Sequence, residues 1–167
     1  MMIRLSKCAL MLGISLFFTL VVFNNIMDYE ANHQFVRHIL MMDTIFPNSP
    51  SLWRHIDNPA IHNLFYWTII LTEAAIAVLS WWGSVKLLRN VKSAAAFAQS
   101  KTVGVAALTL ACCLWLVPFL TIGGEWFLMW QSRVWNGQEE AFRMFVVCAF
   151  VLVYITLREP ETHAAQA

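Results

Sequence analysis

Four long apolar runs constrain this chain more than any other feature of its sequence. They cover residues 5–23, 61–82, 103–122 and 141–157, and they hold only three charged residues, Lys7, Glu73 and Arg143. An α-helix of about 20 residues crosses the ~30 Å hydrocarbon core of a bilayer. The fourth run is shorter, but the long side chain of Arg143 can reach the headgroups. The sequence therefore predicts an all-α, single integral membrane domain over residues 1–167, folded as a four-transmembrane-helix bundle.

The composition agrees with a membrane protein. Hydrophobic residues make up 59% of the chain and charged residues 13%, against about 45–50% and about 25% in soluble domains. The first run follows Arg4 and Lys7, a pattern that also describes a signal peptide. No small-residue cleavage site follows it, so an uncleaved first helix is favoured.

The distribution of basic residues predicts the orientation of the helices. One side would carry seven of them: Arg4, Lys7, Lys86, Arg89, Lys92, Lys101 and Arg158. The other side would carry four, together with seven of the ten acidic residues. Because cytoplasmic loops carry the excess of Lys and Arg, both termini are expected in the cytoplasm. This basic loop needs no nucleic-acid partner to explain it, and the tail after Leu157, which contains Pro160, is expected to fray.

The connection between the first two runs, residues 24–60, is too long for a bare turn. Apolar residues recur in it at helical spacing from Phe35 to Phe46, with polar residues between them. This pattern predicts an amphipathic helix on the outer face, ended by Pro47. Asn58 and Pro59 then form an N-cap and a first helical position, which would open the second span.

Glu73 lies near the middle of the second run, where an ionised side chain costs about 2.5–3.5 kcal/mol on insertion scales. Steps of three and four residues place it on one helix face with His62, Tyr66 and Ser80. This polar stripe suits a proton path, or a pocket for a quinone or another small ligand. It equally suits a neutral Glu73 that hydrogen-bonds another helix and holds the bundle together. The sequence leaves both interpretations open.

The cysteines and histidines argue against redox chemistry. Both outer segments lack cysteine, whereas thiol oxidases of four-helix type need cysteine pairs there; Cys8, Cys112, Cys113 and Cys148 behave as small apolar residues. No helix has a histidine in its interior, as a membrane haem protein would. No cofactor and no metal are therefore predicted.

Two candidate metal sites in the sequence have simpler explanations. His33, His38 and His55 could bind a transition metal on the outer face, but solvated loop residues explain them better. A buried site of Cys112 or Cys113 with Cys148 and Glu73 rests only on their similar depth.

The stretch GGEWFLMWQSRVWNGQEEAFR, Gly123–Arg143, leads from the third run into the fourth. Pro118 before it removes one backbone donor, which predicts a kink in the third helix. Tryptophans are expected at the headgroup level, yet three of the chain's eight tryptophans crowd this stretch. Such a surface suits a lid, a partner helix or the edge of a ligand site.

The order of four runs, the GGEWFLMWQS stretch, the following WNGQ and the AFR that opens the last run carry a resemblance. The chain resembles a family of small bacterial integral membrane proteins that is catalogued as a domain of unknown function. The resemblance implies a four-helix protein of the bacterial inner membrane and implies no reaction. It marks ten residues without giving them roles: Glu125, Trp126, Met129, Trp130, Gln131, Ser132, Trp135, Asn136, Gly137 and Arg143.

Two functions are compatible with these features. The first is an accessory or stabilising subunit without its own catalytic cofactor, embedded in lipid and bound to a larger membrane protein or to a second copy. The alternative is a protein that binds a small ligand, a quinone or a lipid, or couples to protons through the polar stripe. A non-catalytic role is favoured over an enzyme. The outer stretch is interpreted as a recognition or lid surface.

Overall fold

The computed structural model describes residues 1–159, which form helices and connections with no strand among them. The elements are α1 (Met2–Met27), α2 (Tyr29–Met41), η1 (Leu52–Arg54), α3 (Pro59–Arg89), α4 (Ala94–Ser100), α5 (Thr102–Leu114), η2 (Trp115–Trp126), η3 (Met129–Gln131) and α6 (Gln138–Thr156). The all-α prediction is confirmed. The prediction that the tail after Leu157 frays is wrong for its first residues, because Glu159 pairs with Lys7 and Lys101. The tail from Pro160 lies outside the described residues.

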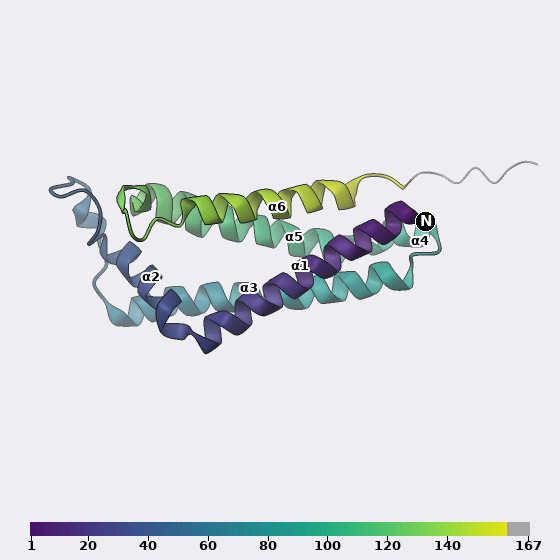
Figure 1. The fold of residues 1–167 in the computed structure, drawn as a ribbon, viewed down its shortest axis with the longest axis horizontal. Helices are drawn as coiled ribbons and strands as arrows, with labels where there is room; N and C mark the ends of the chain where they lie inside the picture. Colours follow the sequence, from purple (N-terminus) through teal and green to yellow (C-terminus); the bar gives the residue numbers. More distant parts are fainter. Residues whose placement is uncertain (160–167) are drawn as a thin grey trace, which may run out of the picture.

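The long helices lie side by side along the molecule (Figure 1). α1 packs on α3, α3 on α5, α5 and η2 on α6, and α6 on α1. Within residues 1–159, three helices are long and apolar enough to cross a membrane: Met2–Met27, Pro59–Arg89 and Ala94–Trp126. These coincide with three of the four apolar runs.

The two ends of the molecule differ. Figure 1 places the amino terminus and α4 at one end, the amino-terminal end, and α2 at the other, the α2 end. The segments predicted to share the basic side meet at the amino-terminal end. The connections before α3 and after η2 meet at the α2 end, so the grouping of segments that the charge pattern predicted is reproduced.

The start of α3 follows its sequence signals. The side chain of Asn58 accepts a hydrogen bond of 2.9 Å from the backbone N–H of Ala60, and Pro59 is the first helical residue. A capping side chain satisfies one of the amides left free at a helix start. The predicted opening of this helix is therefore confirmed.

The amphipathic helix begins and ends earlier in the chain than its apolar pattern predicted, since α2 begins at Tyr29 and not near Phe35. α2 ends at Met41, before the expected stop at Pro47. Met42 adopts a left-handed conformation with φ of 53°, and its N–H bonds to the carbonyl of Ile39 at 3.2 Å. A left-handed residue terminates a helix, so the chain turns away before Phe46. One face of α2 is buried through Val36 and Leu40.

α3 and α5 approach each other closely at two glycines. A Cβ atom added to Gly83 would lie 2.9 Å from both the Cα and the N of Gly104. Small residues at a helix interface let the two backbones come together, which is a common way to associate helices in lipid. This contact positions α3 against the helix that continues into η2.

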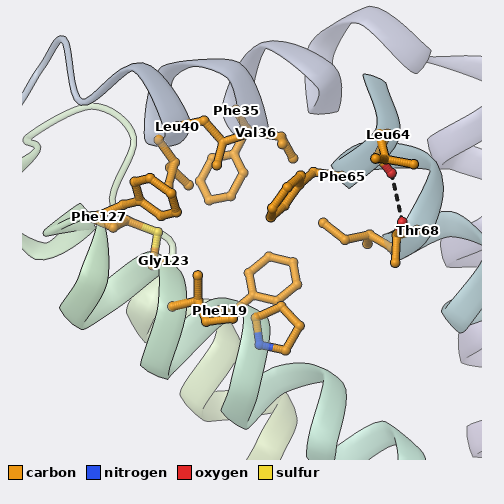
Figure 2. A pocket seen from close by; sticks show the side chains of 14 residues that line it. Phe35, Val36, Leu40, Leu64, Phe65, Thr68, Phe119, Gly123 and Phe127 are labelled. Carbon is orange, nitrogen blue, oxygen red and sulfur yellow. Dashed lines mark hydrogen bonds between the residues drawn. The ribbon is translucent and has the colours of Figure 1, made fainter. Parts of the chain in front are cut away.

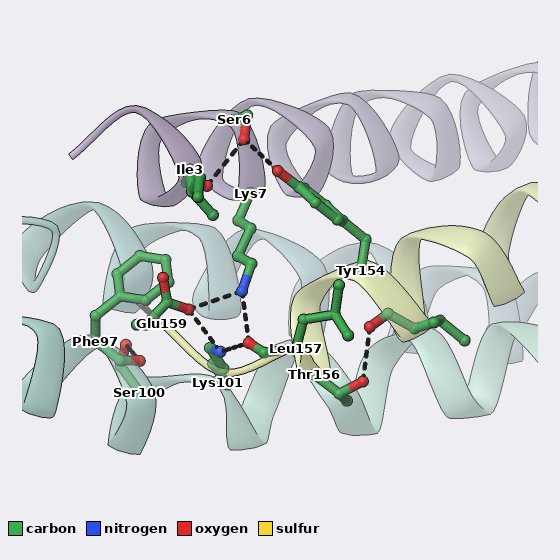
Figure 3. A network of polar contacts seen from close by, with 11 residues as sticks. Ile3, Ser6, Lys7, Phe97, Ser100, Lys101, Tyr154, Thr156, Leu157 and Glu159 are labelled. Carbon is green, nitrogen blue, oxygen red and sulfur yellow. Dashed lines mark hydrogen bonds and ion pairs between the residues drawn. The ribbon is translucent and has the colours of Figure 1, made fainter. Parts of the chain in front are cut away.

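A buried ionic cluster ties three helices together at the amino-terminal end (Figure 3). The Nζ atoms of Lys7 and Lys101 each lie 2.7 Å from Oε1 of Glu159 and each donate to the carbonyl of Leu157 at 2.7 Å. The side chains of Lys7, Lys101 and Glu159 are 0%, 11% and 5% exposed. In the sequence these lysines served only to predict orientation. In the structure they bind the residues that follow α6 and hold its end in place.

Candidate functional site

A polar cavity of about 520 Å³ lies between α1, α3 and η2, beneath the segment that precedes α6. Its walls include Asn25 of α1, Tyr66 and Glu73 of α3, and Trp115 of η2. Other side chains in its walls are Asn32, Phe35, Ile69, Phe119, Trp135, Asn136 and Glu140. Small-molecule sites have volumes of roughly 300–1,000 Å³ and combine apolar walls with a few polar groups. This cavity has both properties.

Asn25 connects the two polar residues of α3 that face this cavity. Its Nδ2 donates a hydrogen bond of 2.6 Å to Oε2 of Glu73, and its backbone carbonyl accepts one of 2.9 Å from the hydroxyl of Tyr66. Glu73 and Tyr66 are each 2% exposed. A buried polar group without a partner is costly, so Asn25 stabilises both side chains and orients them at the cavity wall.

Trp115 carries a buried polar atom whose hydrogen-bonding capacity is not used within the described residues. Trp115 lines the same cavity as Glu73, and the residue is 9% exposed. Its Nε1 is buried and has no hydrogen-bond partner in the described part of the chain. Tryptophan N–H groups usually find a partner when buried, so this donor is an unsatisfied group on a residue of the cavity wall.

The other members of the predicted stripe make different contacts. His62, Tyr66, Glu73 and Ser80 are all buried on α3, at 1%, 2%, 2% and 0% exposure. His62 bonds through Nε2 to the carbonyl of Ile56 at 2.8 Å. Neither His62 nor Ser80 lines the polar cavity. The stripe therefore divides into a cavity-facing pair and two flanking residues that are buried elsewhere.

The wall that carries Trp115 belongs to an unusual helix. The helix does not end at Pro118, where a kink was predicted, and it continues as the π-helical segment η2. Hydrogen bonds spaced by five residues mark it, from the N–H of Phe127 to the carbonyl of Ile122 at 2.9 Å. Proline lacks the N–H that an α-helical ladder needs, and the wider π spacing accommodates that loss. π-Helical turns occur frequently at functional sites.

The aromatic crowding of the outer stretch has a structural cause. Two of the three tryptophans pack onto the connection between α2 and α3. The ring of Trp126 meets that of Trp53 edge-on with centroids 5.9 Å apart, and the guanidinium of Arg54 lies 4.6 Å from the Trp126 ring centroid. Trp130 meets Phe46 at 5.8 Å. The two connections at the α2 end thus hold each other in place.

Trp135 joins this contact to the polar cavity. Its ring stacks on His38 of α2 with centroids 4.7 Å apart and lies 6.4 Å from Phe35. Trp135 and Phe35 both line the cavity. A Cβ atom on the intervening Gly137 would lie 2.7 Å from the Phe35 ring, so a glycine at this position lets the segment lie close over the cavity.

Ser132 organises the backbone of the same segment. Its Oγ accepts hydrogen bonds from the N–H groups of Val134 and Trp135, at 3.3 and 2.9 Å, and from the hydroxyl of Thr44 at 2.8 Å. The residue is 6% exposed. A serine hydroxyl that bonds nearby amides fixes a turn. Ser132 therefore stabilises the turn in the segment between η3 and α6.

The remaining residues of the predicted lid surface do not form one patch. Met129 is buried at 1% exposure, whereas Glu125 and Arg143 are exposed. Gln131 accepts a hydrogen bond of 3.2 Å from the N–H of Phe46. Asn136 lines the polar cavity. The predicted surface thus contains buried supports, cavity residues and exposed side chains.

The outer histidines have contacts of their own. His38 bonds to Asp43 through Nδ1 at 2.8 Å, and His55 bonds to the carbonyl of Leu52 at 2.7 Å. His33 stacks on Tyr29 with centroids 5.5 Å apart. Over residues 1–159, no three His, Cys, Asp or Glu side chains gather as a metal ion would require.

Sequence reasoning missed Asn25 and Trp115. Asn25 closely follows the first apolar run. Its side-chain amide was the sequence signal from which a hydrogen-bond partner for Glu73 could have been predicted. Trp115 lies within an apolar run, where a tryptophan resembles any other core residue. Its free donor becomes visible only when its neighbours are known.

Three apolar helices of spanning length and a buried carboxyl held between helices define an integral membrane protein. A family model described as "Predicted small integral membrane protein (DUF2165)" matches residues 3–158. The chain belongs to this family, as the resemblance of its outer stretch predicted. No curated protein and no solved structure matches the chain.

Proposed function

We propose that the chain is a four-span bundle of a bacterial inner membrane with both termini in the cytoplasm. The packing of α6 against α5, η2 and α1 supports a fourth span, and Arg143 near its start is exposed and can reach the headgroups. Cysteine labelling tests the orientation in a variant with the four native cysteines replaced by alanine. Arg133→Cys should react with an impermeant maleimide in intact cells, and Arg89→Cys only after lysis. The reverse pattern would contradict the orientation.

We further propose that the polar cavity binds a small neutral ring with hydrogen-bonding oxygens, of the quinone class. The observation that carries this proposal is the buried Nε1 of Trp115, which has no partner among residues 1–159 and belongs to a residue that lines the same cavity as Glu73. Leaving a buried donor unsatisfied costs about 1–3 kcal/mol. A ligand oxygen at this position would recover that cost.

The walls favour a flat, uncharged ligand. The described residues that line the cavity include Glu73 and Glu140 and none that is basic. A phosphate would therefore meet like charge without a compensating Lys or Arg. The rings of Phe35 and Phe119 lie 6.4 Å apart at an interplanar angle of 23°, and aromatic faces of this kind suit a planar ring. The carboxyl of Glu73 can accept from a quinol hydroxyl, or donate to a quinone carbonyl when protonated.

Binding of a tailless benzoquinone to the purified protein in phosphatidylcholine nanodiscs tests this function. Trp115→Phe keeps an aromatic ring and removes only the donor, so the dissociation constant should rise about tenfold. Trp126→Phe is the matched control, because Trp126 packs on Trp53 and Arg54 away from the cavity. Equal affinity of wild type and Trp115→Phe, or no binding by wild type, would overturn the proposal.

The accessory-subunit function stays a prediction. It was suggested by the aromatic outer stretch, and those side chains largely pack against the same chain. Exposed faces of Trp126 and Trp130, at 48% and 45%, still offer some surface to a partner. Copurification of a second protein after mild detergent extraction would favour this function, and its loss in Trp130→Ala would locate the contact.

A further inference from the structure

A second cavity, of about 310 Å³, lies between α2, α3 and η2 (Figure 2). Its walls are apolar side chains, among them Leu40, Leu64, Phe119 and Phe127. Thr68 is the exception, and its hydroxyl donates to the carbonyl of Leu64 at 2.8 Å within its own helix. The apolar cavity therefore offers no free side-chain hydroxyl, and it suits hydrocarbon.

The apolar cavity and the polar cavity share a wall. Phe35 and Val36 of α2, Ile69 of α3 and Phe119 of η2 line both of them. The two cavities therefore adjoin at these four side chains. The two cavities together combine hydrogen-bonding groups with an extended apolar region.

The apolar cavity opens on the outside of the chain. Leu64, Phe65 and Ile122 of its walls are 63%, 39% and 37% exposed. These residues belong to α3 and to the helix that continues into η2, both long and apolar enough to cross a membrane. Side chains at this opening would therefore face lipid hydrocarbon.

We propose that the apolar cavity holds the hydrocarbon chain of the ligand whose ring occupies the polar cavity. The ligand class is then a quinone with an isoprenoid or alkyl tail, which enters from the bilayer between α3 and η2. This inference rests on the proposed function. It adds that the chain selects tailed ligands and that the selection resides in residues that do not touch the ring.

Two substitutions that fill the apolar cavity test this inference. Leu64→Trp and Ile122→Trp add bulk from opposite walls, and neither residue lines the polar cavity. Leu71→Trp is the matched control, because Leu71 is 64% exposed on α3 and lines neither cavity. Each variant is titrated in the same phosphatidylcholine nanodiscs with a tailless benzoquinone and with its decyl-tailed analogue. Comparing variants at one lipid content cancels the partitioning of the tailed ligand into lipid.

Wild type and Leu71→Trp should bind the tailed analogue about tenfold more tightly than either filled variant. All four proteins should bind the tailless ring equally, which shows that the filled variants fold. Retention of full affinity for the tailed analogue in both filled variants would overturn the tail site while leaving the ring site intact. Absence of binding by the tailless ring in wild type would overturn the proposed function itself.

Discussion

The amide of Asn25 donates a 2.6 Å hydrogen bond to the carboxyl of Glu73, joining α1 to α3 across 48 residues of sequence. Both partners lie on the wall of the polar cavity. This hydrogen bond explains how a carboxyl group is tolerated within an apolar helix. The stability of the fold should therefore depend on this pair.

Replacing Asn25 with leucine should destabilise the protein, because the buried carboxyl of Glu73 then loses its donor. The expected loss in the free energy of unfolding is about 1–3 kcal/mol. Unfolding in mixed detergent micelles measures it. Glu73→Gln retains an acceptor for Asn25 and should stay close to wild type. A double-mutant cycle of Asn25→Leu with Glu73→Leu should show a coupling of about 0.5–3 kcal/mol; strict additivity would contradict a direct interaction.

The close approach of α3 and α5 should not tolerate even one added methyl group. In Gly83→Ala the new Cβ would lie 2.9 Å from backbone atoms of Gly104, so the helices must separate. Overpacking of this kind costs about 1–3 kcal/mol. Gly13→Ala is the control, since a Cβ there meets nothing within 4 Å. The melting temperature in detergent should fall for Gly83→Ala and stay unchanged for Gly13→Ala; equal values would refute the tight contact.

Ser132→Ala should loosen the segment over the polar cavity. The substitution removes the acceptor of the amides of Val134 and Trp135, and also the bond from Thr44. Amide hydrogen exchange in residues 133–137 should accelerate, with a stability loss of about 1–3 kcal/mol. Thr44→Val removes only the side-chain bond and should give a smaller acceleration. The opposite ranking would show that Ser132 does not support the turn.

The ionic cluster at the amino-terminal end should make stability depend on pH. Burial alone would raise the pKa of the Glu159 carboxyl, but the hydrogen bonds and charges of Lys101 and Lys7 reverse this and hold its pKa below the ordinary value of 4.5. The folded state therefore keeps the carboxylate to lower pH than the unfolded state. The cluster contributes fully above that ordinary value, and its contribution is lost as pH falls through the folded pKa.

Wild type should accordingly be more stable than Glu159→Gln at neutral pH, by on the order of 3–5 kcal/mol, because removal of one partner leaves buried charges. The difference should shrink as the solution is acidified. Unfolding measured between neutral and acidic pH tests both statements. A difference that does not change with pH would mean that the carboxylate charge of Glu159 is unimportant.

Local signals allowed some of the fold to be predicted. The Asn58-Pro59 pair marked the start of α3, and the apolar runs coincide with the long helices, because capping and membrane length depend on neighbouring residues. The end of α2 had no such signal, since Met42 adopts the left-handed conformation without being glycine. At Pro118 the sequence indicated a lost hydrogen bond, but whether the helix kinks or widens depends on what packs around it.

The candidate site was predictable in part for a similar reason. The cost of burying Glu73 follows from its position along the helix, so its need for a partner could be stated in advance. The identity of Asn25 depends on how α1 and α3 cross. The tryptophans of the outer stretch were placed near a surface by composition alone, whereas their packing on Trp53, Arg54 and Phe46 requires the folded connections.

The ionic cluster at the amino-terminal end constrains the order in which the parts of the protein fold. Glu159 follows Lys7 by 152 residues, so a growing chain carries both buried lysines long before their shared carboxylate has been synthesised. Two ammonium groups without that anion repel each other and resist burial. This end of the molecule can therefore close only after α6 and Glu159 have left the ribosome.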